Sequence, residues 1–285
     1  MNHQMVTLSP GLYFVGTPIG TARDITLRAL DVLASADVIA AEDTRSLRRL
    51  MDIHAVPLNG RRVLSYHDHS GAGSRARLLE ALAEGKSVAY ASEAGMPLIA
   101  DPGFDLSRAA AEAGFTVTSA PGPSAVLVAL TLAGLPTDSF FFAGFLPNAK
   151  SARRTRLEEL RGVPGTLVFY ESPKRIGASL SDMAAVLGDD RQAAMCRELT
   201  KKFEEVRRDT LGELASALAT EKLKGEIVVL VDRGRSPSVS DSDLESDLRQ
   251  AMETQSVRDA ADLVARMHGL PRRTVYQLAL QLAKA

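Results

Sequence analysis

The chain has 285 residues, of which 45% are hydrophobic and 24% charged, and its formal net charge is −1. This length has room for two or three domains, and the composition is that of an ordinary soluble globular protein. Because the net charge is close to zero, a polyanionic partner would have to be held by local basic patches. The single cysteine, Cys196, excludes an internal disulfide. No run approaches the ~20 apolar residues of a membrane span, and no charged leader followed by an apolar run opens the sequence, so we expect a cytoplasmic protein.

Strand and helix patterns alternate through the first 119 residues. Apolar strands are expected at 12–16, 38–41, 87–91 and 116–119. Helices are expected from a cap at Asp24 to about Ser35, after the acidic turn EDT (42–44), at 75–84 and at 104–113. Repeated strand–helix–strand units predict a mostly parallel sheet with both faces covered.

The segment SEAGMPLIADPG, residues 92–103, is the most informative stretch of the sequence. It joins an expected strand to an expected helix and is about twice as long as the usual connection of ~2–6 residues. Gly95 and Gly103 permit backbone conformations that other residues resist, while Pro97 and Pro102 stiffen the loop. Since α/β proteins bind ligands at the carboxyl ends of their strands, we expect this loop to bind one.

A second set of α/β elements begins near the loop APGPS, residues 120–124. Ser124 can cap a helix at 125–133, whose free N–H groups would suit an anion. Further strands are expected at 140–144, 166–170, 193–197 and 227–231, with helices at 180–187 and 211–223. The continuous apolar run IVVLV predicts a central position for the last strand. We therefore expect two α/β domains with mostly parallel sheets forming a cleft, at 1–119 and 120–235.

The remaining residues, 236–285, are expected to form a small helical domain after the polar linker GRSPSVSDSD (234–243). A helix at 244–252 precedes one capped by Ser256 and another at 272–284, and the short Gly-containing turn between the last two is typical of a helix-turn-helix. Residues 263–285 contain no acid and four basic residues, which favours phosphate contact: Arg266, Arg272, Arg273 and Lys284. A helical cap or a dimer contact is the alternative.

No metal site or nucleophile motif stands out. His67, Asp68 and His69 have no second cluster spaced to complete a metal coordination sphere, so no metal is expected. The remaining candidates for a functional site are polar loops at the ends of the expected strands, which would line one cleft between the two α/β domains. Basic residues near three of these ends favour a phosphate-bearing substrate, although each cluster alone is usually a solvated surface: Lys150, Arg153, Arg154 and Arg156 before a helix, Lys174 and Arg175, and Arg197, Lys201 and Lys202.

Nine motifs occur in order along the chain: GTPIG (16–20), AAEDTR (40–45), YHDHS (66–70), SEAGMPLIADPG (92–103), PGPSA (121–125), GFLP (144–147), FYESPKR (169–175), RELTK (197–201) and GEIVVLV (225–231). Together they resemble the bacterial small-subunit ribosomal RNA cytidine 2′-O-methyltransferases, of the tetrapyrrole-methylase superfamily. The resemblance spans roughly residues 11–285 and includes the helix-turn-helix tail. It implies S-adenosyl-L-methionine as methyl donor in a cleft between two α/β domains. It also implies a homodimer that methylates a cytidine 2′-hydroxyl in the decoding region of the RNA or of the assembled small subunit.

The resemblance assigns cofactor contacts by position to Pro18, Ser92, Glu93, Ala94, Gly95, Met96, Ile99, Ser124, Ala125, Tyr170 and Gly225. Three residues depart from the family pattern, which has Asp and Thr in place of Glu93 and Met96, and Asn in place of Thr21. Glu93 keeps the charge but reaches one methylene further, whereas Met96 loses a hydroxyl donor. The roles of residues 93 and 96 are therefore open.

Methyl transfer depends on aligning the ribose oxygen with the methyl group, and a ribose hydroxyl is helped by a base or by a cation near the developing alkoxide. Asp43, His67 and Glu198 are candidate proton acceptors, and Arg45, Arg197 and Lys201 are candidate cationic stabilisers. For Asp43 and Arg45 the alternative is a helix cap and a surface ion pair. RNA contacts are expected from eight residues: Lys150, Arg153, Arg154, Lys174, Arg175, Arg266, Arg272 and Arg273.

Three other functions compete with this interpretation. A sibling methylase acting on a tetrapyrrole or another small molecule is disfavoured by the basic clusters and the tail. A ligand-sensing helix-turn-helix regulator is disfavoured by the near-neutral charge, and a phosphate-binding hydrolase by the lack of a metal cluster or a nucleophile motif. The enzymatic interpretation requires the loop that begins at Ser92 to share a cavity with Ser124 and Tyr170.

Overall fold

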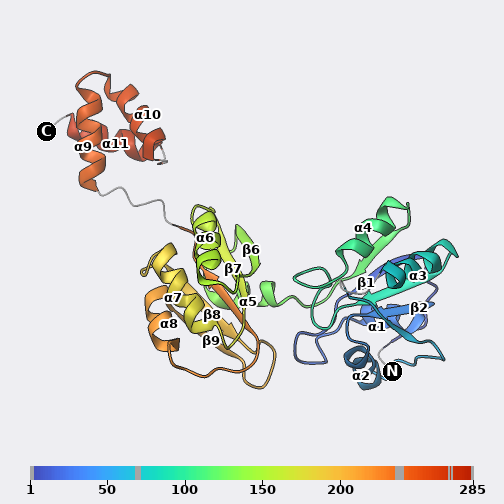
Figure 1. Cartoon of the computed structure of the whole chain (residues 1–285). Helices are drawn as coiled ribbons and strands as arrows, with labels where there is room; N and C mark the ends of the chain where they lie inside the picture. Colours follow the sequence, from blue (N-terminus) through green and yellow to red (C-terminus); the bar gives the residue numbers. More distant parts are fainter. Residues whose placement is uncertain (1–2, 68–71, 235–240, 269, 271, 284–285) are drawn as a thin grey trace. The chain divides into compact units, whose positions relative to one another are not determined.

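The computed structural model describes residues 3–67, 72–234, 241–268, 270 and 272–283. It divides into two compact units, Met1–Arg233 and Gly234–Ala285 (Figure 1). The first unit contains two five-stranded sheets, and the second is helical. No helix within the described residues has both the length and the apolar character needed to cross a bilayer.

The first sheet has the strand order β3-β2-β4-β1-β5, and all its neighbouring strands are parallel, as expected. Its strands are β1 (Gly11–Val15), β2 (Val38–Ala41), β3 (Val63–Ser65), β4 (Ser87–Ala91) and β5 (Val117–Ala120). Every residue of β4 is buried, since alternate side chains enter two different apolar clusters. One cluster holds α1 (Leu27–Ser35) and α2 (Thr44–Ile53), and the other holds α3 (Ala72–Ala83) and α4 (Phe104–Glu112), so the two helix pairs cover opposite faces.

The caps of the first two helices explain where they begin. The hydroxyl of Thr26, rather than the predicted carboxylate of Asp24, caps α1 by accepting a hydrogen bond from the N–H of Ala29 at 3.1 Å. The prediction for Asp24 is wrong because the extended residue directly before the first helical turn is Thr26. Asp43 caps α2, accepting from the N–H groups of Arg45 at 2.7 Å and Ser46 at 3.1 Å.

The second sheet has the order β6-β7-β10-β8-β9, with β6 (Phe140–Phe145), β7 (Thr166–Glu171), β8 (Gln192–Arg197), β9 (Glu205–Thr210) and β10 (Ile227–Val231). Only β6 and β7 are parallel; the other three pairings are antiparallel. The expected mostly parallel arrangement is therefore wrong for this sheet, because β9 returns directly alongside β8 without a crossover helix. The predicted central position of β10 is confirmed, and all its residues are buried.

Helices cover both faces of the second sheet. Helix α5 (Ala125–Ala133) packs on one face, and α6 (Lys150–Leu160), α7 (Ile176–Leu187) and α8 (Leu211–Leu218) pack on the other. The cluster on the α5 side contains the buried Cys196. The basic residues that were expected to precede a helix, beginning with Lys150, lie inside α6.

The second unit contains α9 (Asp241–Met252), α10 (Val257–His268) and α11 (Arg272–Leu282) around one small apolar core. Leu248, Val264 and Val275 are among its most buried residues. The predicted cap is confirmed, since the hydroxyl of Ser256 accepts a hydrogen bond from the N–H of Asp259 at 3.2 Å. Lys284 lies outside the described residues.

Candidate active site

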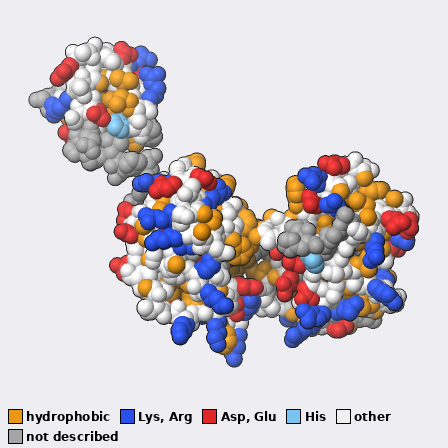
Figure 2. All heavy atoms as spheres, viewed as in Figure 1, with side chains coloured by type: hydrophobic (Ala, Val, Ile, Leu, Met, Phe, Trp, Pro, Cys, Tyr) orange, Lys and Arg blue, Asp and Glu red, His pale blue; other side chains and the backbone are white. Residues whose placement is uncertain are grey.

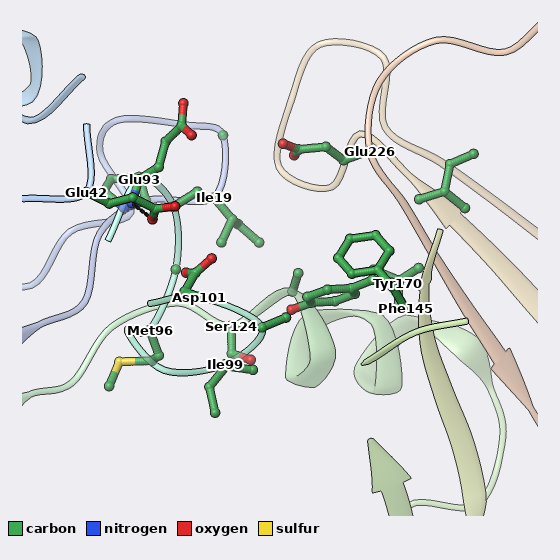
Figure 3. A pocket seen from close by; sticks show the side chains of 18 of the residues that line it. Ile19, Glu42, Glu93, Met96, Ile99, Asp101, Ser124, Phe145, Tyr170 and Glu226 are labelled. Carbon is green, nitrogen blue, oxygen red and sulfur yellow. Dashed lines mark hydrogen bonds between the residues drawn. The ribbon is translucent and has the colours of Figure 1, made fainter. Parts of the chain in front are cut away.

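A cavity of about 480 Å³ lies inside the first unit, and loops that follow strands of both sheets line it (Figure 3). Glu93 and Asp101, from the 92–103 loop, stand on one side, and Tyr170 and Glu226 on the other, with Ser124 between them. The cavity required by the sequence argument is therefore present, because the loop beginning at Ser92 lines it together with Ser124 and Tyr170.

Close backbone contacts explain the glycines that border this cavity. The turn after β1 forms a bridge with the 92–103 loop, in which the N–H groups of Thr17 and Gly95 donate to each other's carbonyl oxygens at 2.9 and 3.0 Å. Gly95 has φ +82°, a left-handed conformation that favours glycine. A Cβ atom on Gly122 would lie 2.8 Å from the Cα of Gly16. The three loops therefore pack backbone against backbone beneath the cavity.

Two residues that depart from the family pattern make contacts of their own. The sulfur of Met96 accepts a hydrogen bond from the N–H of Gly122 at 3.2 Å, so it links two of these loops. Thr21 donates two hydrogen bonds to Thr200, one from its N–H to the Thr200 hydroxyl at 3.1 Å and one from its hydroxyl to the Thr200 carbonyl. These contacts join the TPIG turn to the RELTK loop.

Carboxylates dominate the polar lining of the cavity. Burial, together with the charge of Glu42, raises the pKa of Asp101 to about 7, and a hydrogen bond from Ser92 offsets this only in part. Burial and the charge of Glu42 also raise the pKa of Glu93, whose N–H donates to Oε2 of Glu42 at 3.1 Å. The cavity therefore favours a bound cation or a proton over a bound anion.

The opposite wall is aromatic and apolar. The ring of Tyr170 meets those of Phe142 and Phe145 edge-on, with centroid distances of 4.9 and 5.6 Å. Burial and the charge of Asp101 raise the pKa of the Tyr170 hydroxyl to about 12, so the phenol stays neutral at physiological pH. Such a wall suits a flat ring system.

Lys201 brings the only ammonium or guanidinium group among the described lining residues. Its Nζ lies 2.9 Å from Oε1 of Glu198 and 2.8 Å from Oε2 of Glu226. Burial opposes the ionised form of Glu198, but hydrogen bonds from Lys201 and from the N–H of Glu226 hold its pKa below the usual value. Glu198 does not line the cavity itself, and its carboxylate packs so closely on Gly225 that a Cβ atom there would clash with it.

Nine of the eleven expected cofactor residues line the cavity: Pro18, Glu93, Ala94, Gly95, Met96, Ile99, Ser124, Ala125 and Tyr170. Ser92 is buried and lines a neighbouring recess instead. Several other residues line the cavity although they were not expected there, notably Glu42, Asp101, Phe145 and Glu226. Each of these residues belongs to one of the nine ordered motifs, and this membership could have identified them as lining residues.

Of the six expected catalytic residues, only Lys201 lines the cavity. Asp43 caps α2, and Arg45 is 91% exposed and lies 3.6 Å from Asp43, as the alternative interpretation expected. Arg197 forms an ion pair with Glu205 at 2.8 Å. His67 is exposed and does not line the cavity, while Asp68 and His69 lie outside the described residues.

The residues expected to contact RNA differ in accessibility. Arg153 is buried and forms an ion pair with Asp182 at 2.6 Å, so it braces α6 against α7 and is not accessible to RNA. Arg175 donates to the carbonyl of Leu146 and to the side chain of Asn148. Lys150, Arg154, Lys174 and Arg273 are exposed. Arg266 donates to the main-chain carbonyl of Asp262, whose carboxylate pairs with Arg272.

The chain is similar to known proteins along most of its length. The model of the family described as Tetrapyrrole (Corrin/Porphyrin) Methylases matches residues 11–215, and that of the RsmI C-terminal HTH domain matches residues 238–283. The ribosomal RNA small subunit methyltransferase I of Mesorhizobium japonicum is 46% identical over 96% of this chain and 93% of its own. The protein of the same name from Escherichia coli O157:H7 is 41% identical over 98% of both chains.

Solved structures share the fold of the first unit at low identity. Diphthine synthase matches with a TM-score of 0.60 and 19% identity, over 78% of this chain and 89% of its own. Cobalt precorrin-4 methyltransferase matches with a TM-score of 0.57 and 20% identity, over 78% of this chain and 94% of its own. A uroporphyrin-III C-methyltransferase from Thermus thermophilus, solved with S-adenosyl homocysteine, has a TM-score of 0.52 and 19% identity, over 77% and 96% of the two chains.

Proposed function

Because the chain belongs to the tetrapyrrole methylase family, and within it to the ribosomal RNA small subunit methyltransferases I, we propose that it methylates the 2′-hydroxyl of a cytidine in small-subunit ribosomal RNA. S-adenosylmethionine is the methyl donor. The observation that carries the proposal is the single cavity shared by the 92–103 loop, Ser124 and Tyr170.

The lining fits this donor chemically. Glu42, Glu93 and Asp101 favour the positive charge of a sulfonium, while Ile99 and the Tyr170 ring offer apolar surface to an adenine. The bound sulfonium supplies an already activated methyl group. The main task of the surrounding residues is therefore to align the ribose oxygen and exclude water.

Among the carboxylates of the cavity, Asp101 has the pKa that best suits a proton acceptor for the ribose hydroxyl. It lines the cavity and is partly buried, and its pKa of about 7 is close to the optimum for a general base at neutral pH. Asp43 and Glu198 are held in their ionised forms by hydrogen bonds elsewhere. We therefore propose Asp101 as the proton acceptor in place of Asp43, His67 and Glu198, and the Lys201 ammonium as the group that stabilises the developing alkoxide.

The acidic lining is unsuited to phosphates, so the RNA backbone must be held outside the cavity. Exposed cations, including Lys150, Arg154 and Lys174, together with the helical domain at 236–285, are proposed to dock the RNA or the assembled subunit. A homodimer and a cytoplasmic location remain predictions, as does the division of the first unit into domains at 1–119 and 120–235.

Mass spectrometry of small-subunit RNA tests the function directly. RNA from cells that lack this chain should miss one ribose methyl group, and the purified protein with S-adenosylmethionine should restore it. An unchanged modification pattern would refute the proposal. Visible-absorbance titration with a precursor corrin should give no spectral change, and a gel shift should show no preference for duplex DNA; the opposite results would favour the competing functions.

A further inference from the structure

The cations nearest to the cavity are largely neutralised by carboxylates. Lys201 lies between Glu198 and Glu226, Arg197 pairs with Glu205, and Arg175 lies 3.3 Å from Glu171. The cavity lining itself is acidic. If a nucleotide enters this cavity, the phosphates on either side of it need cations that are not already paired.

Helix α2 carries such cations on its outer face. Leu47 and Met51 point into the core, while Arg45, Arg48 and Arg49 are exposed. Residues three and four apart share one side of a helix, so the three arginines form one basic face, with the exposed Asp52 as its acidic member. Figure 2 shows Lys and Arg side chains at the surface where Figure 1 places α2, beside a group of Asp and Glu.

These guanidinium groups are available for a ligand. Arg48 and Arg49 make no ion pair or side-chain hydrogen bond with another residue in the described part of the chain. The contact of Arg45 with Asp43 is 3.6 Å long at an exposed position, where ion pairs contribute little. Asp43 is in addition engaged as the helix cap. The basic face of α2 therefore retains most of its charge.

The same helix borders the active site. A recess of about 180 Å³ beside the main cavity is lined by Arg49, Leu50 and Ile53 of α2, and it shares four lining residues with that cavity: Pro18, Gly20, Ser46 and Glu93. The side chain of Ile53 is 56% exposed. The recess therefore combines the aliphatic side chains of Leu50 and Ile53 with the guanidinium group of Arg49 and the carboxylate of Glu93. A base can pack on the aliphatic side chains while the guanidinium group binds its phosphate.

We propose that the basic face of α2, formed by Arg45, Arg48 and Arg49, binds phosphates of the RNA strand next to the methylated nucleotide. Arg49 holds the phosphate of a neighbouring nucleotide whose base occupies the recess against Leu50 and Ile53. This inference rests on the proposed function and identifies where the substrate strand leaves the active site. None of the three arginines takes part in methyl transfer itself.

The test compares two charge-matched double variants of the full-length protein. R48Q/R49Q removes two cations from α2, whereas R77Q/R161Q removes two exposed arginines, one from α3 on the opposite face of the first sheet and one after α6. Glutamine is a good helix former, so the helices are retained. The substrate is the small ribosomal subunit from cells that lack this chain, and calorimetry gives the affinity for S-adenosylmethionine.

For R48Q/R49Q we expect KM for the subunit to rise about tenfold, and the salt dependence of binding to weaken by about 0.7 per lost phosphate contact. The values of kcat and of cofactor Kd should stay within about twofold, and R77Q/R161Q should behave as wild type. R48K/R49K should restore the salt dependence, because lysine keeps the charge. Equal effects of the two glutamine variants would overturn the inference. If the wild-type protein fails to methylate the subunit, it is the proposed function that fails.

Discussion

Lys201 donates a hydrogen bond from its Nζ to Oε1 of Glu198 at 2.9 Å, and this contact joins a side chain that lines the cavity to a carboxylate behind the lining. Glu198 has φ +51°, an uncommon backbone conformation for a residue other than glycine. Its carboxylate also accepts a hydrogen bond from the N–H of Glu226, and the carboxylate of Glu226 accepts a second hydrogen bond from Lys201. The ammonium group is therefore positioned by two carboxylates at the edge of the cavity.

Replacing Lys201 by alanine should lower the single-turnover rate of methyl transfer at least about tenfold, because the developing alkoxide loses a nearby positive charge. Affinity for S-adenosylmethionine should be unchanged or slightly higher, since the cavity becomes more acidic around a cationic ligand. Rapid-quench assays and calorimetry measure the two effects. Lys202→Ala, at the exposed neighbouring position, is the control and should match wild type. Normal turnover with a large loss of cofactor affinity would contradict this role.

Replacing Asp101 by asparagine should lower the rate of methyl transfer by about 10²–10⁴-fold, because the proton acceptor is lost. The wild-type rate should rise as the pH passes about 7, where Asp101 ionises, and the variant should lack this rise. The pH dependence of single-turnover rates checks both statements. Asp43→Asn is the matched control: asparagine also caps helices, so its profile should keep the rise near pH 7. A rise retained in the Asp101 variant would remove this residue from the mechanism.

Asp101→Asn should make the protein more stable above neutral pH, although it lowers the rate of methyl transfer. The folded protein holds the proton of Asp101 up to about pH 7, whereas the unfolded chain releases it near 3.8, the ordinary pKa of an aspartate side chain. The unfolded state therefore binds fewer protons between these two values, and the free energy of unfolding falls as the pH rises through them. The asparagine variant lacks this loss, so its Tm should exceed that of wild type at pH 8 and approach it near pH 4. Thermal unfolding at several pH values measures the difference, and a pH-independent difference would contradict the raised pKa.

The sequence predicted strands of the fold through local apolar patterns, and it predicted most of the cavity lining through ordered motifs. The apolar runs of β4 and β10 predict buried strands from the local sequence alone. Strand β9, with the sequence EVRRDT, carries four charged residues and was not predicted, because it is an edge strand with no fully buried residue and therefore has no apolar pattern to mark it. Most of the loop residues that were predicted to bind the cofactor from their motifs do line the cavity. Asp101 was not singled out, since its pKa is raised only once folding buries the carboxyl group and brings the charge of Glu42 near it.

The sequence also did not predict which basic side chains are exposed to solvent, and two adjacent arginines of α6 test this difference. Arg153 and Arg154 are adjacent, yet Arg153 is buried against Asp182 while Arg154 is exposed. Arg153→Ala should lower the free energy of unfolding by about 3–5 kcal/mol, because it leaves a buried carboxylate without its partner. Arg154→Ala should change it by less than about 0.5 kcal/mol. Urea denaturation measures both, and equal stabilities would mean that the Arg153–Asp182 ion pair does not brace α6 and α7.

Deleting residues 236–285 should weaken binding to the small ribosomal subunit while leaving the two sheets folded. The tail has its own apolar core around Leu248 and Val264 and forms a separate compact unit, so its removal leaves no cavity in either sheet. We expect KM for the subunit to rise about tenfold or more as phosphate contacts are lost, with the affinity for S-adenosylmethionine and the thermal transition of the remaining unit unchanged. In the full-length protein, R266Q/R273Q should reproduce part of the KM effect without any truncation. Methylation of the subunit at the wild-type rate by the truncated protein would show that the tail does not dock the substrate.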